Sequence, residues 1–281
     1  MNSSSAQGKL YVVSTPIGNL GDFSFRAVEV LRGVSAILAE DTRHSRTLLD
    51  RYEIETRVLA YHEHNEAKTT PALVARLQSG EDLALITDAG TPLVSDPGAR
   101  LVRAAVDAEI PIVPIPGASA LLAGLVASGL ETDRFTFYGF LPRKGKERAK
   151  TLAELASLRH TAVVYEAPTR LAATLGELEE LGAGDRLAVV AREMTKQYEE
   201  IRRGTLSALR AYYDNAPPRG EIVIVLAGVS ERPLDETEVR ERARSLRAEG
   251  ASARDVAAAL VSELGVGRNR AYQIAQEESD A

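Results

Sequence analysis

The sequence predicts an α/β protein of two domains, followed by a small all-helical domain. Short apolar runs alternate with segments of helical periodicity through most of the chain. The apolar runs are continuous instead of alternating, which is typical of strands in a sheet covered on both faces. The last part of the chain has helical periodicity without a strand pattern. A chain of 281 residues with 44% hydrophobic and 26% charged residues is long and apolar enough for two folded domains.

The first half of the chain supplies one α/β domain. Apolar and β-branched runs predict strands over residues 9–14, 35–39, 57–61, 83–87 and 112–115. The segments between them have helical periodicity and predict helices over residues 25–32, 45–52, 71–78 and 99–107.

The second half repeats this pattern. Strands are expected over residues 134–138, 161–165, 186–191 and 221–227, and helices over residues 146–157, 170–181 and 206–214. The segment 199–203 is expected to form a hairpin with the strand that ends near Arg192.

The end of the chain predicts three short helices, over residues 236–248, 253–263 and 268–276, with breaks at Gly250 and Gly265. This arrangement resembles a helix-turn-helix, although a helical cap on the sheet domains explains it equally well. From Glu231 on there are 8 basic and 11 acidic residues, which argues against a general phosphate clamp. The predicted division is a disordered tail over 1–8, α/β domains over 9–117 and 118–230, and a helical, helix-turn-helix-like domain over 231–281.

Composition limits the chemistry and the compartment. The chain has no cysteine, which excludes disulfides, thiolate metal ligands and a thiol nucleophile. The N-terminus lacks the basic and apolar regions of a signal peptide, and the apolar stretch 118–130 is too short to span a bilayer. We therefore expect a cytoplasmic protein. The net charge of −6 argues against a surface that binds nucleic acid everywhere.

Three loops that follow strands are candidates for ligand binding, since open α/β sheets bind ligands beyond the carboxyl ends of their strands. No dinucleotide, P-loop, zinc-protease or hydrolase motif is present. The loops instead combine glycine and proline with polar residues: STPIGNLGD from Ser14, DAGTPLVSDPG from Asp88 and PIPGASA from Pro114. The second loop is too long for a plain connection. The third leads into a small-residue helix, whose N-terminus suits a carboxylate.

Charged residues also follow strands. The sequence Glu40-Asp41-Thr42-Arg43 lies on the expected rim, although Asp41 or Thr42 could simply cap the next helix. The run from Arg143 to Lys150 has five positive charges and one negative charge, and it is the best local candidate for a phosphate-binding surface.

His62 and His64 are spaced as in a chelating strand end, but a third histidine and any cysteine are missing nearby. We therefore expect no metal site, and we interpret these histidines as hydrogen-bonding or nucleotide-contacting residues.

Six ordered blocks resemble the tetrapyrrole methylase superfamily of S-adenosylmethionine-dependent methyltransferases. They are LYVVSTPIGNLGD, AEDTRHSRTLL, ITDAGTPLVSDPG, PIPGASALLAGLVASGL, FYGFLPRKGKER and VVYEAPTRL. More narrowly, they are similar to the family of bacterial 16S ribosomal RNA (cytidine-2′-O)-methyltransferases. The resemblance covers residues 9 to 230, and the helical tail is also similar.

The resemblance implies two α/β domains with a cofactor cleft between them, and S-adenosylmethionine as the cofactor. Many relatives have Gly-Asp-Pro where this chain has Gly90-Thr91-Pro92, so either Asp88 or Thr91 could make the main polar contact. The positions that the resemblance assigns to cofactor binding are Pro16, Asp88, Gly90, Thr91, Val94, Ser119, Ala120, Ala167, Pro168, Gly220 and Glu221.

The implied activity is 2′-O-methylation of a cytidine ribose in the decoding region of 16S ribosomal RNA, as free RNA or within the small ribosomal subunit. A base to orient or deprotonate the hydroxyl would come from Glu40, Asp41, Asp88 or Glu193, which the sequence does not rank. Phosphate contacts are expected from a further set: Arg43, Arg143, Lys144, Lys146 and Arg148.

Two alternatives remain at this point. One is C-methylation of a tetrapyrrole, the activity of sister families, which the two basic blocks disfavour because a tetrapyrrole carries its own carboxylates. The other is a non-catalytic RNA-binding adaptor. The superfamily also implies a homodimer.

Overall fold

The computed structural model describes residues 7–229, 236–264 and 266–278. Contacts along the chain divide the protein into two compact units, the first ending at Val229 and the second beginning at Ser230. Most of the predicted N-terminal tail and of the predicted linker after Val229 lies outside the described residues, as does the predicted break at Gly265. Gly8 is buried, and its amide donates to the Leu77 carbonyl at 2.8 Å. The domain boundaries at residues 117 and 230 stay predictions.

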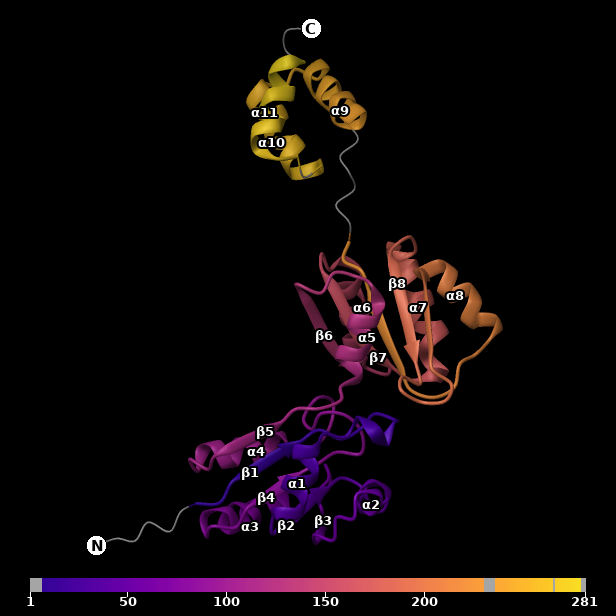
Figure 1. Ribbon diagram of the computed structural model, residues 1–281. Coiled ribbons are helices and arrows are strands. Elements are labelled where there is room, and N and C mark those ends of the chain that lie inside the picture. The colour runs from indigo at the N-terminus through magenta and orange to yellow at the C-terminus, as the bar shows by residue number, and fades with distance from the viewer. Residues whose placement is uncertain (1–6, 230–235, 265, 279–281) are drawn as a thin grey trace, which may run out of the picture. The chain divides into compact units, whose positions relative to one another are not determined.

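The first sheet is entirely parallel, with the strand order β3-β2-β4-β1-β5 (Figure 1). Its strands are β1 (Leu10–Val13), β2 (Ala36–Ala39), β3 (Val58–Ala60), β4 (Leu83–Leu85) and β5 (Ile112–Ile115). The helices are α1 (Phe25–Gly33), α2 (Thr42–Arg51), α3 (Glu66–Gln78) and α4 (Ala99–Asp107). Two apolar clusters cover the two faces: one includes Leu31 and Leu49 of α1 and α2, and the other includes Leu77 and Leu101 of α3 and α4. The continuous apolar strands are explained by this double coverage.

Two helices of this half begin earlier than predicted. Helix α2 starts at Thr42, because the Asp41 side chain accepts hydrogen bonds from the amides of Arg43 at 2.8 Å and His44 at 3.2 Å. Helix α3 starts at Glu66 and contains Pro71, which the prediction had placed at its first position. A proline lacks the amide that the helix ladder uses, so sequence patterns favour a start at proline over an interior place.

The second sheet is mixed, with the order β6-β7-β10-β8-β9 (Figure 1). Its strands are β6 (Phe135–Phe140), β7 (Thr161–Glu166), β8 (Leu187–Arg192), β9 (Glu200–Thr205) and β10 (Ile222–Leu226). The predicted hairpin is confirmed, since β8 and β9 pair in antiparallel fashion.

Helices cover this second sheet as well. The helices are α5 (Ala120–Ser128), α6 (Lys146–Ser157), α7 (Leu171–Leu178) and α8 (Leu206–Asn215). Side chains of α6, α7 and α8 form one apolar cluster with the sheet. Leu125 of α5 belongs to a separate cluster, which also contains Ile17 from the loop after β1 and Met194 from the loop after β8. The two sheets are therefore joined by packing close to the predicted ligand loops.

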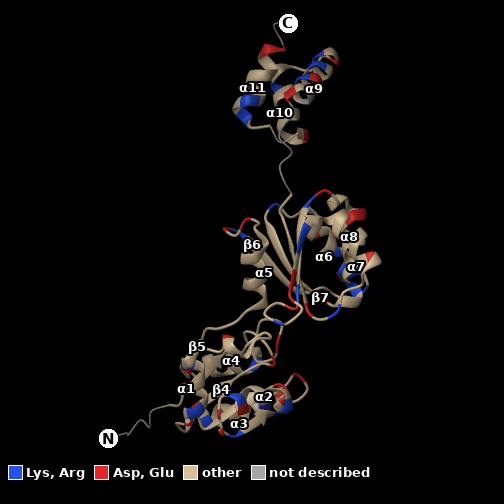
Figure 2. Ribbon diagram, turned by 45° about the vertical axis from the view of Figure 1, so that its right-hand side comes forward, with Lys and Arg blue, Asp and Glu red and all other residues tan. Residues whose placement is uncertain are grey.

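The second unit consists of α9 (Glu236–Ala248), α10 (Ala253–Leu264) and α11 (Arg268–Glu277), with their own apolar cluster. Basic and acidic residues are interspersed on these helices (Figure 2). Arg240 pairs with Glu277 at 2.7 Å, Arg242 with Glu263 at 2.8 Å and Arg244 with Glu278 at 2.8 Å. These arginines are neutralised within the unit, which fits the expectation that the tail is not a general phosphate clamp.

Within the described ranges, none of the helices has the length and apolar character that crossing a bilayer requires.

Candidate functional site

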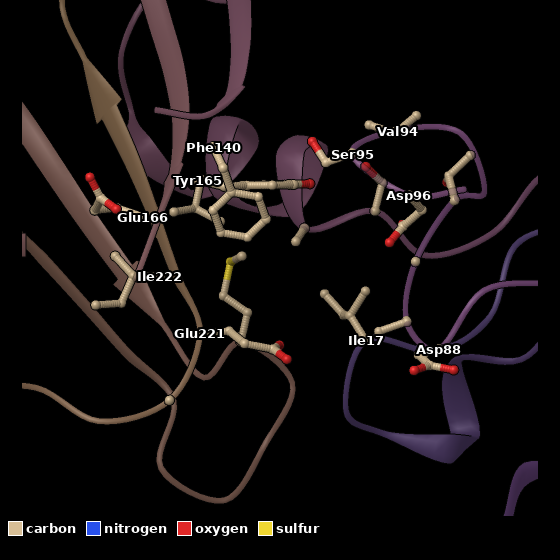
Figure 3. Close-up of a pocket in the computed structure, with 18 of the residues that line it drawn as sticks. Ile17, Asp88, Val94, Ser95, Asp96, Phe140, Tyr165, Glu166, Glu221 and Ile222 are labelled. Atoms are coloured by element: carbon tan, nitrogen blue, oxygen red, sulfur yellow. The ribbon is translucent and has the colours of Figure 1, made fainter. Parts of the chain in front are cut away.

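A cavity of about 480 Å³ lies where loops from both sheets meet, in the first unit (Figure 3). Its walls come from the loop after β4, the start of α5, the loop after β7 and the segment that leads into β10. Cavities of this size hold small organic ligands in proteins. It therefore lies at the strand ends where the sequence predicted ligand binding.

The loop after β4 is held in an unusual backbone conformation. Leu93 and Ser95 have φ of 72° and 70°, values that side chains other than glycine adopt rarely. Gly90 has φ of 84° and pairs with Thr15 through two backbone hydrogen bonds, of 2.8 and 3.1 Å. The Thr91 hydroxyl donates to the Ala118 carbonyl at 3.2 Å. The loop after β1 and the start of α5 thus hold the loop against the cavity.

Three carboxylates line the cavity: Glu40, Asp88 and Asp96. Burial, together with the charge of Glu40, raises the pKa of Asp96 to about 6. Burial also raises the pKa of Glu40, and the neighbouring Asp88 adds to this effect. These side chains come from different strand ends and share one low-dielectric region, so each makes ionisation of the others less favourable.

An aromatic and apolar wall stands opposite the carboxylates. Phe140 and Tyr165 lie side by side, with ring centroids 5.5 Å apart (Figure 3). The Tyr165 hydroxyl accepts a hydrogen bond of 3.0 Å from the Leu121 amide, which fixes the ring at the start of α5. Other apolar lining residues are Ile17, Met194, Ile222 and Val223.

Most residues predicted to bind the cofactor line this cavity. They are Asp88, Gly90, Thr91, Val94, Ser119, Ala120, Ala167, Pro168, Gly220 and Glu221. Pro16 does not line it and instead borders a neighbouring cavity of about 290 Å³. Both candidates for the main polar contact, Asp88 and Thr91, face the larger cavity, so the choice between them stays open.

The four candidate bases separate into two groups. Glu40 and Asp88 line the cavity, whereas Asp41 and Glu193 do not belong to its lining. Asp41 caps α2, and its hydrogen bonds to backbone amides lower its pKa. The Glu193 carboxylate accepts from Lys196 Nζ at 3.0 Å and from the Glu221 amide at 3.1 Å. The structure therefore corrects the expectation for Asp41 and Glu193, whose carboxylates hold local structure together.

Of the residues predicted to bind RNA, Arg43, Arg143, Lys144 and Lys146 are exposed. Arg148 is an exception and a correction, because its side chain is buried. Its guanidinium donates to Glu177 at 2.9 Å, to the Thr174 hydroxyl at 2.9 Å and to the Pro142 carbonyl at 3.1 Å. Arg148 thus connects α6 to α7 and is not available to a phosphate.

Sequence reasoning did not assign Asp96, Phe140, Tyr165 or Met194 to the site. Asp96 lay in a loop already singled out, so its position was a usable signal. Phe140 carried no such signal, since a phenylalanine at the end of an apolar strand is usually a core residue.

In the ranges that the structure covers, no group of three or more histidine, aspartate or glutamate side chains could hold a metal ion. The rings of His62 and His64 lie near each other, with centroids 6.0 Å apart.

The model of the tetrapyrrole (corrin/porphyrin) methylases matches residues 9–210, which include both sheets' ligand loops up to α8. The chain belongs to the tetrapyrrole methylase family. Proteins named ribosomal RNA small subunit methyltransferase I are similar to it over nearly their whole length. The Synechocystis sp. protein is 46% identical over 96% of this chain and 98% of its own, and the Escherichia coli O157:H7 protein is 41% identical over 99% and 98%. Within the family, the chain belongs to this group of proteins.

Solved structures of more distant tetrapyrrole methylases share the fold. Uroporphyrin-III C-methyltransferase of Thermus thermophilus, crystallised with S-adenosylhomocysteine, matches with a TM-score of 0.56 at 19% identity, over 78% of this chain and 97% of that one. A diphthine synthase matches with a TM-score of 0.63 at 16% identity, over 79% and 90%.

Proposed function

We propose that this protein transfers a methyl group from S-adenosylmethionine to the ribose 2′-oxygen of a cytidine in the decoding region of 16S ribosomal RNA. The observation that carries the proposal is the similarity, over nearly the full length, to proteins named ribosomal RNA small subunit methyltransferase I. The cavity at the loop junction supplies the chemistry that such a reaction needs.

The cavity fits S-adenosylmethionine in size and in the character of its walls. Its volume of about 480 Å³ is suitable for a nucleoside with an amino acid side arm. The carboxylates of Glu40, Asp88 and Asp96 suit a ligand that carries an ammonium, a sulfonium and ribose hydroxyls. The apolar wall that includes Met194 and Val223 suits an adenine ring. Gly90, whose positive φ requires glycine, brings the backbone to the cavity surface.

The residues of the chain then have two tasks. When bound, S-adenosylmethionine supplies a methyl group on a cationic sulfur. Its transfer breaks the carbon–sulfur bond, forms a carbon–oxygen bond to the ribose and releases the hydroxyl proton. The first task of the protein is to align the ribose oxygen, since orientation alone can lower a barrier by about 7–11 kcal/mol.

The second task is to accept the hydroxyl proton, and we assign it to Asp96. Its carboxylate lies in the cavity, and its pKa of about 6 keeps it ionised at neutral pH while making it a better base than an ordinary aspartate. The charges of Glu40 and Asp88 favour protonation of Asp96 once the hydroxyl proton is released.

The exposed cations near the cavity would hold the RNA backbone. Arg143, Lys144 and Lys146 follow the end of β6, which reaches the cavity wall at Phe140. Arg43 lies near the start of α2, directly after Glu40 and Asp41. Such contacts provide register on the RNA without reading its sequence.

We further propose that the protein works in the cytoplasm as a homodimer, on RNA within the small ribosomal subunit. Large exposed apolar side chains on α5, Leu122 at 51% and Val126 at 74% exposure, support association with another surface. Light scattering of the purified chain tests the dimer: a mass of 30.3 kDa, that of one chain, would contradict it.

The activity is tested by mass mapping of methylated nucleotides in ribosomal RNA from cells with and without this protein. We expect one 2′-O-methylated cytidine in 16S RNA to disappear and to return when the purified protein and S-adenosylmethionine are added to the small subunits. An unchanged RNA would contradict the proposal. Methylation of a uroporphyrinogen-type substrate in its place would support the tetrapyrrole alternative, and failure to bind S-adenosylmethionine in calorimetry would support the adaptor.

A further inference from the structure

Phe140 occupies an unusual position for a strand residue. Its side chain lines the cavity, yet 57% of it remains exposed to solvent. A large apolar side chain that is exposed beside a ligand cavity marks a contact surface more often than a packing residue.

A β-bulge points Phe140 toward the cavity. In the pairing of β6 with β7, Phe137 lies opposite Val163 and Phe140 lies opposite Tyr165, so β6 has one residue more than its partner. Side chains three residues apart on a regular strand point to opposite faces. The extra residue brings Phe137 and Phe140 to the same face, where their ring centroids lie 4.9 and 5.5 Å from that of Tyr165.

The glycine before Phe140 makes this bulge possible. Gly139 has φ of 63°, in the left-handed region that favours glycine. A Cβ at this position would lie 3.0 Å from the Ser95 Oγ, in the loop after β4. The bulge therefore lies directly against the loop that carries Asp96, and Phe140 stands at the mouth of the cavity close to the proposed base.

The Phe140 ring is also the last apolar group before a basic surface. Arg143, Lys144 and Lys146 follow it along the chain, and all three are exposed. An exposed aromatic ring followed by exposed cations is the combination that binds a single-stranded nucleotide, with the base on the ring and the phosphates on the cations.

We propose that Phe140 positions the target nucleotide by stacking on its base at the mouth of the cavity. This inference rests on the proposed function, because it assumes an RNA substrate. The base would leave its place in the RNA and lie on the exposed face of Phe140, whose other contacts with Tyr165 hold the ring in place. The ribose of that nucleotide would then reach the interior, where Asp96 lies.

The test compares Phe140→Ala with wild type on small ribosomal subunits from cells that lack the protein. The loss of one base–aromatic stack predicts an increase of about 10- to 100-fold in KM for the subunits. The dissociation constant for S-adenosylmethionine, measured by calorimetry, should stay within twofold. Phe140→Trp should restore KM, whereas Phe140→Leu, which is apolar without a ring face, should not.

A matched control and a modified substrate separate stacking from a structural role. Phe135→Ala removes the same side chain from the start of the same strand, at a position that does not line the cavity, and should leave KM unchanged. With subunits reconstituted from 16S RNA that lacks the base at the mapped nucleotide, wild type and Phe140→Ala should bind equally.

The outcomes distinguish this inference from the proposed function. If wild type methylates no RNA, the proposed function fails and the stacking role fails with it. If wild type methylates the subunits and Phe140→Ala has an unchanged KM, only the stacking role is overturned. A Phe140→Ala protein that binds S-adenosylmethionine more weakly but the subunits normally would place the ring against the cofactor, which also overturns it.

Discussion

Replacing Asp96 by asparagine should remove activity and stabilise the protein at the same time. The pKa of Asp96 is raised from 3.8 to about 6, chiefly because the carboxylate is partly buried. Only the ionised form can accept a proton, so the methyl transfer rate of wild type should rise with pH up to about 6 and then level off. Asparagine cannot accept the proton, and the rate should fall by about 10²- to 10⁴-fold.

The same pKa shift determines the change in stability. The folded protein binds this proton more tightly than the unfolded chain, so wild type loses stability as the pH rises from about 4 to about 6. At 1.36 kcal/mol for each pH unit, the upper limit of the loss is about 3 kcal/mol. Because the side chain keeps contact with water, screening reduces the expected loss to about 1–2 kcal/mol. Asp96→Asn avoids it and should be more stable than wild type by that amount at pH 8.

Two measurements check this prediction. Urea unfolding at pH 8 and pH 4 should give a higher midpoint for Asp96→Asn at pH 8 and similar midpoints at pH 4, where both side chains are neutral. Transfer rates on small ribosomal subunits should show the loss of activity. Asp133→Asn, a change at an exposed loop carboxylate, serves as the control for both. A less stable Asp96→Asn protein at pH 8, or one with the wild-type rate, would refute the reasoning.

Three further substitutions test other parts of the structure. Arg148→Ala should lower the free energy of unfolding by about 3–5 kcal/mol, because it breaks a buried ionic network, whereas Lys146→Ala should change it little; equal unfolding midpoints would contradict this. The double variant Lys144→Ala, Lys146→Ala should weaken RNA binding and lower the slope of log affinity against log salt by about 1.4, with unchanged S-adenosylmethionine affinity; equal losses of both affinities would refute the assignment. Tyr165→Phe leaves the Leu121 amide without its 3.0 Å acceptor and should cost about 1–3 kcal/mol in urea unfolding; an unchanged midpoint would show that water replaces the hydroxyl.

Local patterns predicted most of the secondary structure. Helix α6 occupies the predicted residues, and α9, α10 and α11 agree to within a residue. These helices follow from periodicity, which is a property of the segment itself. Strand β6 extends two residues beyond the prediction, to Phe140, because the bulge that continues it depends on pairing with β7.

The place of the site was also predictable, since strands of a parallel sheet end at a common edge and their loops converge there. The loops after β4 and β5 were identified for this reason, and most of their predicted residues line the cavity. The roles of individual charges were less predictable. Asp41 and Asp88 both follow strands, and only the hydrogen bonds of Asp41 to its own helix distinguish them.

The sequence by itself determined the α/β class, the separate helical tail, the family and the loops that form the site, because these depend on periodicity and on motifs within short segments. Only the tertiary structure decided which charges are free to act. Arg148 is buried against Glu177, although its neighbours in the same basic run are exposed. Asp96 and Phe140 face the cavity because a strained loop and a bulge turn them there. Burial and direction arise from contacts between segments distant in sequence, and a local pattern does not contain them.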